Sequence, residues 1–314
     1  MVDRQVPRWS DITPLLGLKA PFTGPSALER ATTIEDLRAL ARRRVPRTVF
    51  DYVDGAAGQE LSLIRSRDAF RRVEFHAHVL KDVVEVDTSC DFLGTRSRLP
   101  FAFSPTGFTR MMNHEGEPAV ASVAQEFGIP YALSTLGTTS PEELAAACPG
   151  TRRWFQLYLF REKQSREQLL ERVRASGFDT IILTVDTVVA GSRLRDVRNG
   201  LTIPPQLSWR TLGEMSRHPR WWTNALTTPP LEFASLRSTD GTVADLINNV
   251  FDPSLSRDDL RWLRNAWPGK LLVKGVQHVD DAVLVLDEGA DGVILSNHGG
   301  RQLDRSVVPL ELLG

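Results

Sequence analysis

The chain has 314 residues, which is the length of one large domain or two ordinary ones. Hydrophobic residues make up 41% and charged residues 25%, as in globular proteins, and the net charge of -1 argues against a nucleic-acid-binding protein that relies on bulk positive charge. Two cysteines, Cys90 and Cys148, are too few for a disulfide scaffold or a cysteine-rich zinc site, and they fit a reducing compartment.

The N-terminal segment 1–32 is rich in proline, glycine and polar residues, and we expect an extended arm there. Met1–Ser10 carries charges and a proline where a signal peptide needs an apolar core, and no run reaches the length of a membrane span. We therefore expect a cytoplasmic protein and leave open a peripheral contact with the inner face of the membrane. Thr33 and Asp36 predict the start of a first helix, and Pro46 opens a second one at Arg47–Val53.

Short apolar runs alternate with helical patterns from about residue 99 onward. Several helices stop at a glycine just before the next run, as at Gly177 and Gly289. This alternation predicts a parallel sheet, either open and doubly wound or closed as a (β/α)₈ barrel. The predicted strands are Phe101–Ser104, Tyr131–Ser134, Trp154–Tyr158, Thr180–Val185, Leu271–Lys274 and Gly292–Ser296.

One interval between strands is much longer than a strand and a helix require. The starts of the strands at Thr180 and Leu271 lie 91 residues apart, which leaves roughly 50–60 extra residues, at about 195–255, for a lid or binding loop. This insertion contains Trp209 and Trp221-Trp222. We interpret the tryptophans as packing the insertion onto the domain; the alternative is a contact surface for a partner or a membrane.

Every predicted strand ends in polar or small residues, where ligands bind in parallel α/β folds. His298 and Arg301 follow the last strand, and together they supply a proton acceptor and a two-pronged donor for a carboxylate. Asp186 is the natural partner for the histidine, although a helix N-cap is an equal alternative. Lys274 ends an apolar strand and should face an anionic or electron-rich ligand, because burying an unpaired ammonium is costly.

The common cofactor motifs are absent from the sequence. There is no P-loop, and no G-x-G-x-x-G follows the first strand, so a Rossmann nicotinamide site is unsupported. Neither H-E-x-x-H nor Cys-x-x-Cys occurs, so the sequence predicts no metal. A lysine, a histidine and arginines at strand ends without these motifs favour a flavin.

The segment from Ser296 to Asp304, SNHGGRQLD, resembles the FMN-dependent 2-hydroxy-acid dehydrogenase and oxidase family. Further similar motifs occur in family order from about residue 33 to the end. They are Phe50-Asp51-Tyr52, Pro105-Thr106-Gly107, Glu115-Gly116-Glu117, Phe155-Gln156-Leu157-Tyr158, Leu183-Thr184-Val185-Asp186 and Val273-Lys274-Gly275. The arm and the insertion look most like those of bacterial quinone-linked L-lactate dehydrogenases.

The resemblance implies a (β/α)₈ TIM barrel over residues 33–314 with FMN at its C-terminal mouth. It implies that His298 is the base and Asp186 its partner, and that Lys274 stabilises negative charge on the reduced flavin. The implied substrate-binding residues are Tyr52, Tyr158, Arg193 and Arg301. The implied FMN-binding residues are Pro105, Thr106, Gly107, Ser134, Gln156, Thr184, Lys274 and Ser296.

The implied reaction is oxidation of an L-2-hydroxy acid, with electrons passed to a quinone. By resemblance L-lactate, oxidised to pyruvate, ranks ahead of glycolate and mandelate as the substrate. The alternatives are an oxygen-using oxidase or monooxygenase, a flavoenzyme that oxidises a modified peptide, and an inactive remnant. The intact Arg301 argues against the peptide substrate. Family members are often homo-tetramers, and nothing suggests nucleic acid.

The sequence departs from the family at its C-terminal end. Six strands are predicted where the barrel has eight, and the segments that grip the FMN phosphate do not occur after Leu310. We therefore expect a C-terminally shortened member whose last two strands are missing and which binds FMN poorly by itself. A fragment of a longer protein is the first explanation, and a truncated gene or completion by another chain are the others.

Overall fold

The computed structural model describes residues 26–160, 162–200, 213, 216–236 and 253–313. Residues 1–25 of the predicted arm, and much of the predicted insertion including Trp209, lie outside these ranges. The chain divides into two compact units, Met1–Val45 and Pro46–Gly314. In the first unit, helix α2 (Ile34–Arg44) begins after the N-cap Thr33, and the predicted capping box with Asp36 is present.

The second unit contains the remaining described elements. Its helices are α3 (Arg47–Asp54), α4 (Leu61–Arg71), α5 (Thr109–Met112), α6 (Gly116–Phe127), α7 (Pro141–Ala147), α8 (Lys163–Ala175), α9 (Leu194–Asn199), α11 (Pro219–Thr227), α13 (Arg257–Ala266) and α14 (Val279–Asp287). Its strands are β1 (Cys90–Phe92), β2 (Thr95–Ser97), β3 (Tyr131–Ser134), β4 (Arg153–Leu157), β5 (Thr180–Thr184), β6 (Lys270–Val276) and β7 (Gly292–Leu295). Three short 3₁₀ turns complete it: η1 (Ala234–Leu236), η2 (His298–Gly300) and η3 (Pro309–Leu312).

The five strands β3 to β7 form one parallel sheet in chain order, which confirms the alternating pattern of the sequence. The predicted strand at Phe101–Ser104 is wrong. It is reduced to a single bridge between Phe103 and Tyr131. The next bonds of the ladder would need the amides of residues 105 and 130, and both are prolines. Proline has no amide hydrogen to donate, so the ladder cannot extend in either direction.

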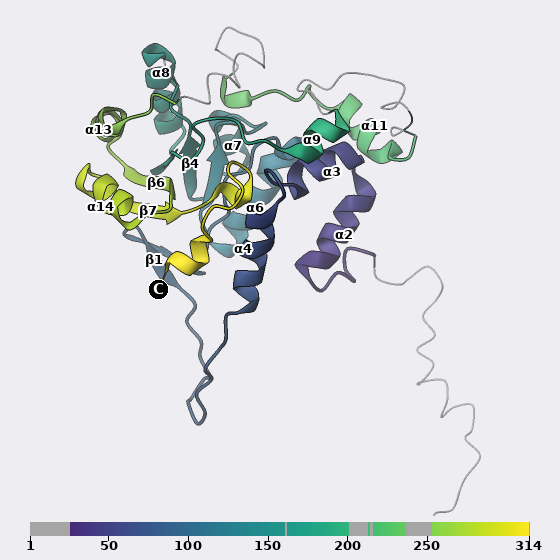
Figure 1. Ribbon diagram of the computed structural model, residues 1–314, viewed down its shortest axis with the longest axis horizontal. Helices are drawn as coiled ribbons and strands as arrows, with labels where there is room; N and C mark the ends of the chain where they lie inside the picture. Colours follow the sequence, from purple (N-terminus) through teal and green to yellow (C-terminus); the bar gives the residue numbers. More distant parts are fainter. Residues whose placement is uncertain (1–25, 161, 201–212, 214–215, 237–252, 314) are drawn as a thin grey trace, which may run out of the picture. The chain divides into compact units, whose positions relative to one another are not determined.

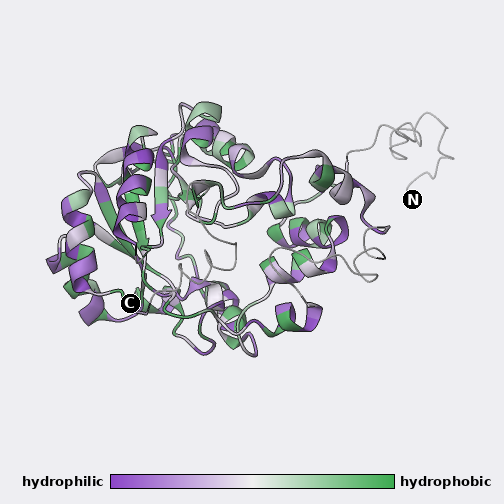
Figure 2. Ribbon diagram, turned by 90° about the horizontal axis from the view of Figure 1, so that it is seen from above, coloured by the Kyte–Doolittle hydropathy of each residue, from purple (hydrophilic) through white to green (hydrophobic). Residues whose placement is uncertain are grey.

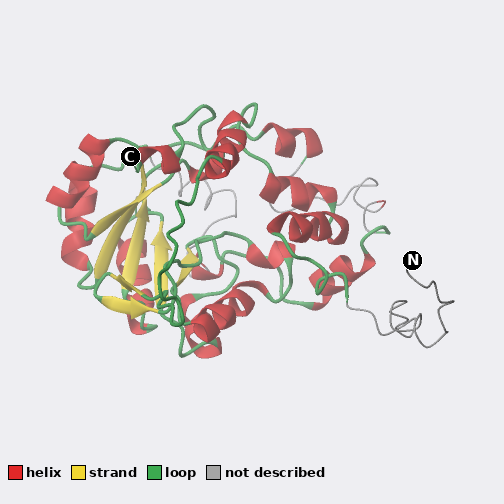
Figure 3. Ribbon diagram, turned by 90° about the horizontal axis from the view of Figure 1, so that it is seen from below, coloured by secondary structure: helices red, strands yellow, loops and turns green. Residues whose placement is uncertain are grey.

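The two faces of the sheet carry two separate apolar layers, because strand side chains alternate between faces. One face holds the cluster of Ala132, Trp154, Ile182 and Leu272, against which Ile294 packs. The intervening residues, such as Phe155, Ile181 and Val273, are fully buried on the opposite face. Helices α8, α13 and α14 lie together on one side of the sheet (Figures 1 and 3).

A two-stranded hairpin that the sequence reasoning missed covers the apolar cluster. Strands β1 and β2 pair antiparallel around Leu93 and Gly94, whose φ angles of 58° and 82° are typical of a tight two-residue turn. The Phe92 ring contacts the edge of Trp154 at a centroid distance of 5.9 Å. A glycine turn between β-rich residues was the signal for this hairpin.

The distribution of hydropathy agrees with this layering. Green, apolar strands lie beside helices with mixed purple and green faces (Figure 2). Such amphipathic helices bury one side against the sheet and leave the other in water. Among the described helices, none is long and apolar enough to cross a membrane.

Candidate active site

A row of polar side chains crosses the carboxyl ends of the five strands. Each member lies two positions beyond a residue of the apolar layer formed by Ala132, Trp154, Ile182, Leu272 and Ile294. Because strand side chains repeat every two residues, the polar row faces the same side of the sheet as that layer. We call this row the polar rim, and its members are Ser134, Gln156, Thr184, Lys274 and Ser296.

Hydrogen bonds fix the side chains of the polar rim. The Ser134 hydroxyl donates to Oε1 of Gln156 at 3.0 Å, and Nε2 of Gln156 donates to the Thr184 hydroxyl at 2.9 Å. The Lys274 ammonium donates to the Ser296 hydroxyl at 3.0 Å. Burial lowers the pKa of Lys274, while the negative charge of Asp186 opposes that shift. The rim therefore offers oriented donors, one of them cationic, to a ligand above the strands.

His298 and Asp186 form a close pair beside the rim. Nδ1 of His298 lies 2.7 Å from Oδ1 of Asp186, whose side chain is only 6% exposed. An ionised carboxylate only accepts hydrogen bonds, so the Nδ1–H of the imidazole donates and its Nε2 is left to act as a base. Glycine is needed at Gly275, because a Cβ there would lie 2.7 Å from Cβ of Asp186. The chain thus leaves room for the carboxylate behind the ring.

A left-handed turn brings His298 back over the sheet. His298, Gly299 and Gly300 have φ angles of 57°, 67° and 71°. Two glycines adopt this conformation without penalty, whereas the histidine is strained there. The Asn297 side chain holds the turn by accepting the amide hydrogen of Gly300 at 3.1 Å and donating to the carbonyl of Val307 at 3.1 Å.

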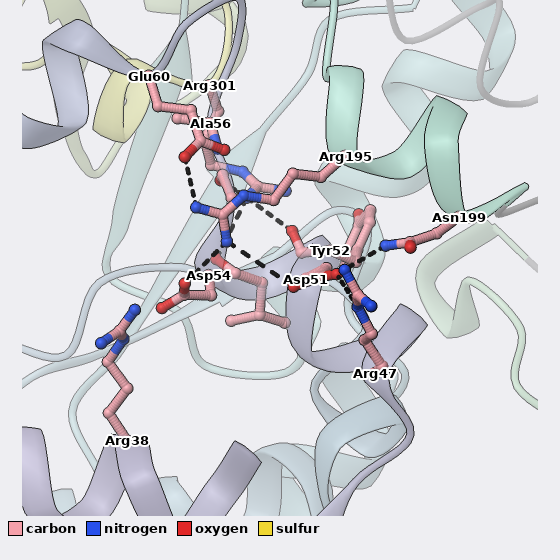
Figure 4. A network of polar contacts seen from close by, with 12 residues as sticks. Arg38, Arg47, Asp51, Tyr52, Asp54, Ala56, Glu60, Arg195, Asn199 and Arg301 are labelled. Atoms are coloured by element: carbon pink, nitrogen blue, oxygen red, sulfur yellow. Dashed lines mark hydrogen bonds and ion pairs between the residues drawn. The ribbon is translucent and has the colours of Figure 1, made fainter. Parts of the chain in front are cut away.

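Two arginines flank the ring of Tyr52. The guanidinium carbons of Arg193 and Arg301 lie 5.0 and 5.2 Å from its centroid, within the range of cation–π contacts. Nη1 of Arg301 donates to the carbonyls of Tyr52 and Gly55 at 2.8 and 2.7 Å (Figure 4). Burial lowers the pKa of Arg301, and the nearby charge of Arg193 lowers it further. Two adjacent positive charges with unused donors form a site for a carboxylate.

Tyr158 is buried next to this anion site. Burial raises the pKa of its phenol, and the carboxylate of Asp186 raises it further. The hydroxyl therefore stays protonated across the physiological range and is available as a hydrogen-bond donor or acceptor.

The polar rim, His298, Tyr52, Tyr158 and the two arginines line one cavity of about 400 Å³. The sequence-predicted residues on its wall are Tyr52, Pro105, Thr106, Gly107, Ser134, Gln156, Tyr158, Thr184, Arg193, Lys274, Ser296, His298 and Arg301. Asp186 lies behind His298 instead. The wall also includes Val53, Ser104, Leu136, Gly299 and Gln302, which the sequence reasoning missed although most adjoin predicted positions.

Asp304 belongs to the motif after the last strand but does not line the cavity. Its carboxylate accepts the amide hydrogens of Ser62 and Gln59 at 3.0 and 2.9 Å, at the start of α4. The motif thus has a structural end as well as a ligand-facing one. The local sequence did not indicate this role, because the partners of Asp304 lie far away in the sequence.

The donor set fits the ring of a flavin. The pyrimidine edge of an isoalloxazine presents ring nitrogens and carbonyls, which need hydrogen-bond donors and, when reduced, a nearby positive charge. The polar rim supplies hydroxyls, an amide and the Lys274 ammonium, which is bonded to only one rim hydroxyl in the cavity wall. Gly107 also lines the cavity and brings no side chain to it.

Comparison with known proteins agrees with this fit. Residues 41–314 match the family model described as FMN-dependent dehydrogenase. The chain is 54% identical, over 99% of its length and 76% of the relative, to a Mycobacterium tuberculosis (strain ATCC 25618 / H37Rv) protein named "Putative L-lactate dehydrogenase". It is 39% identical to the L-lactate dehydrogenase of Caulobacter vibrioides (strain NA1000 / CB15N), over 86% of the chain and 72% of the relative.

A solved structure with the same fold is described as that of the monotopic membrane protein (S)-mandelate dehydrogenase. It superimposes with a TM-score of 0.85 and 36% identity, over 90% of this chain and 76% of that one. The fold and the site together define a flavin-dependent α/β-barrel oxidoreductase, although the described strands do not close the barrel. The chain belongs to the FMN-dependent dehydrogenase family.

Proposed function

We propose that the chain oxidises an L-2-hydroxy acid, L-lactate to pyruvate in the first instance, with FMN as its cofactor. The observation that carries this proposal is His298, which lies 2.7 Å from Asp186 behind it, in a cavity wall that also contains two arginines beside Tyr52. A base next to a carboxylate site is what removal of a proton from a 2-hydroxy acid requires. The names of two relatives, L-lactate dehydrogenases, support lactate as the substrate.

In this proposal Arg193 and Arg301 bind the carboxylate of the substrate, and Tyr52 and Tyr158 contact its carboxylate and hydroxyl. Holding the substrate at two points orients its α-carbon toward the polar rim. The reacting groups are then already close together, which lowers the barrier to reaction. Tyr158 is a suitable contact for the hydroxyl because its raised pKa keeps the phenol neutral.

His298 is the base. Oxidation removes two electrons and two protons from the substrate, and FMN supplies the two-electron acceptor. His298 takes the hydroxyl proton if hydride leaves the α-carbon, or the α-proton if the electrons remain there first. The imidazole becomes positively charged on either route, and Asp186 stabilises that charge.

The residues of the polar rim, together with Pro105, Thr106 and Gly107, are the proposed contacts of the flavin. Lys274 is the cation among them and stabilises negative charge on the reduced ring. Its lowered pKa reflects the cost of holding an ammonium in this buried position.

The proposed domain is residues 33–314, preceded by an arm at 1–32 and interrupted by the insertion at about 195–255. We propose a quinone as the electron acceptor and peripheral attachment to the inner face of the membrane. A solved relative described as a monotopic membrane protein supports this attachment. A homo-tetramer is the proposed assembly of the complete barrel.

An absorbance spectrum tests the proposal. The purified chain is mixed with FMN and titrated with L-lactate without oxygen, with D-lactate as the stereochemical control. We expect the flavin bands to bleach with L-lactate alone. Bleaching by mandelate and not by lactate would make mandelate the substrate. Bound flavin that no 2-hydroxy acid bleaches would contradict the proposal.

The electron acceptor needs a separate measurement. Reduced flavin is mixed with a soluble quinone or with oxygen, and its reoxidation is followed. Faster reoxidation by the quinone is expected, whereas rapid reoxidation by oxygen would make the chain an oxidase or monooxygenase.

A further inference from the structure

Arg195 lies two residues after the substrate-site Arg193 and forms ion pairs with three carboxylates near the cavity. Its Nη1 lies 3.0 Å from Oδ2 of Asp54, and its Nη2 contacts the carboxylate of Glu60. Oδ1 of Asp51 lies 3.8 Å from Nη1 of Arg195 (Figure 4). The side chains of the three acids are between 7% and 17% exposed. Water therefore screens these pairs less than ordinary surface pairs.

The three acids belong to the segment that presents Tyr52. Asp51 and Asp54 lie on α3 on either side of Tyr52 in the sequence, and Glu60 ends the turn that follows α3. Glu60 also accepts the amide hydrogen of Ala56 at 3.1 Å, which fixes the turn. Arg195 thus joins the N-terminal end of α9 to the element that carries the aromatic wall of the substrate site.

Two further contacts connect the same elements. The amide of Gly58 donates to the carbonyl of Ser192 at 2.9 Å, just before Arg193. Asn199, at the other end of α9, donates from Nδ2 to Oδ2 of Asp51 at 2.8 Å. Helix α9 has only six residues and no buried side chain, so its place depends on these polar contacts and not on apolar packing.

The charge balance makes Arg195 the critical member of the set. Without it, Arg47 still lies 3.2 Å from Asp51 and Arg67 3.9 Å from Asp54, but Glu60, beyond the end of α3, loses its ion pair. Loss of one partner of a buried ion pair is costly because it leaves charge uncompensated. We therefore expect that, without Arg195, the start of α9 moves away from α3 and takes Arg193 with it.

We propose that Arg195 is a positioning residue, which holds α9 against α3 so that Arg193 stays over the ring of Tyr52 beside Arg301. This proposal rests on the proposed function, since it assigns Arg193 to the substrate carboxylate. Arg195 does not line the cavity. Its loss should therefore weaken binding of the carboxylate without changing the flavin or the base.

The test compares Arg195→Met with Arg198→Met, an exposed arginine on the same helix that provides a matched control. We expect Arg195→Met to raise the KM for L-lactate by about 10- to 100-fold, as for a small misplacement of a binding group, with kcat changed by less than about threefold. Bound FMN and its spectrum should not change. Arg195→Lys should recover part of the KM, because its single ammonium reaches one carboxylate and not two.

Hydrogen exchange provides a readout that needs no turnover. The amides of Gly58 and of residues 196–197 should exchange faster in Arg195→Met than in the wild type, and Arg198→Met should leave Gly58 unchanged. If Arg195→Met does not fold, Glu60→Gln tests the same pair with a smaller change, and a rise in KM of about threefold to tenfold is expected.

Two results would overturn the proposal. One is unchanged exchange at Gly58 in Arg195→Met; the other is faster exchange with an unchanged KM, which would leave Arg195 a purely structural role. Oxalate has the carboxylate but no α-hydrogen, so it can bind and cannot be oxidised. Its binding therefore tests the positioning role of Arg195 separately from the proposed oxidation of lactate. If the wild type oxidises no lactate, weaker oxalate binding in Arg195→Met still supports positioning, and equal binding contradicts it.

Discussion

His298 occupies a backbone conformation that side chains rarely adopt. Its φ of 57° places it in the left-handed region, and this costs of order 1–3 kcal/mol for a residue other than glycine. The strain is offset locally, because its amide donates to the Ser296 hydroxyl at 3.0 Å and its ring pairs with Asp186. The same turn that strains the backbone brings the imidazole into the cavity wall.

Removal of the base tests the role of this residue. We expect His298→Gln to lower the rate of flavin reduction by L-lactate by about 10²- to 10⁴-fold, the usual contribution of a general base. FMN should remain bound, because Gln keeps the backbone bond to Ser296. Stopped-flow absorbance measures the rate, and a rate near that of the wild type would remove His298 from the role of base.

Arg301 allows a sharper distinction between charge and geometry. Its Nη1 donates to the backbone carbonyls of Tyr52 and Gly55, while the rest of the guanidinium can bind a carboxylate with two parallel hydrogen bonds. A lysine has a single nitrogen and cannot do both. We expect Arg301→Lys to raise the KM for L-lactate by at least about tenfold and to lower kcat less. Arg305→Lys, at an exposed position four residues on, is the control. Equal KM values in both variants would contradict a two-pronged contact.

At the scale of elements, the loop after β7 holds the turn between α3 and α4 at two points. Arg301 donates to the carbonyl of Tyr52 in the last turn of α3, and Asp304 accepts the amide hydrogens of Gln59, just before α4, and of Ser62 in its first turn. The two residues therefore act as tertiary caps for two helices. Because Tyr52 lies on α3, the loop that carries the base also fixes the wall of the substrate site.

The cap at α4 makes a measurable contribution to stability. We expect Asp304→Ala to lower the free energy of unfolding by about 1 kcal/mol, the typical loss for a helix-capping side chain. Asn retains an acceptor, so Asp304→Asn should lose less. Denaturant unfolding at neutral pH measures both variants, and equal stability of Asp304→Ala and the wild type would contradict the cap.

The contribution of Asp304 should depend on pH. Burial raises the pKa of its carboxyl, but the amide hydrogen bonds from Ser62 and Gln59 outweigh this and hold the pKa below its ordinary value. A lowered pKa in the folded state stabilises the protein above the pKa of the unfolded state, and the effect disappears as pH falls through the folded value. The difference between the wild type and Asp304→Ala should therefore shrink in acid; a difference that grows would contradict this.

At the scale of the whole molecule, the sequence predicted the local pattern well and the long-range contacts poorly. Strand β3 has the predicted bounds, β4 is shifted by one residue at both ends and β5 is one residue shorter, because their apolar runs are short and sharply bounded. The segment at Phe101–Ser104 looked the same, but Pro105 and Pro130 lack the amide hydrogens that would extend its ladder. Whether the sheet is open or barrel-like was decided by relatives and not by periodicity.

The site shows the same division. Residues at strand ends were predictable because parallel strands bring their carboxyl ends to one edge. Arg195 was not, because its partner Asp54 lies 141 residues away and neither residue stands out locally. Asp304 was part of a recognised motif, yet the amide of Ser62 that it caps is 242 residues distant. Contacts of this kind depend on the tertiary fold and not on the spacing of residues in the sequence.

The polar rim draws on all five strands of the parallel sheet, so a ligand bound across it should stabilise the sheet as a unit. A ligand that binds only the folded state adds about 2.7 kcal/mol to the free energy of unfolding at 100 times its Kd. We therefore expect FMN to raise the melting temperature in proportion to the logarithm of its concentration. Riboflavin, which has the same ring and no phosphate, should also raise it, because the described contacts face the ring.

Differential scanning fluorimetry against FMN, riboflavin and ADP measures these shifts, with ADP as the phosphate control without a flavin ring. Lys274→Met removes the only ammonium of the rim and should reduce the shift with both flavins. The rim would not be the flavin site if ADP matched FMN, or if Lys274→Met kept the full shift. A shift with FMN and none with riboflavin would place the binding energy in the phosphate instead of the ring.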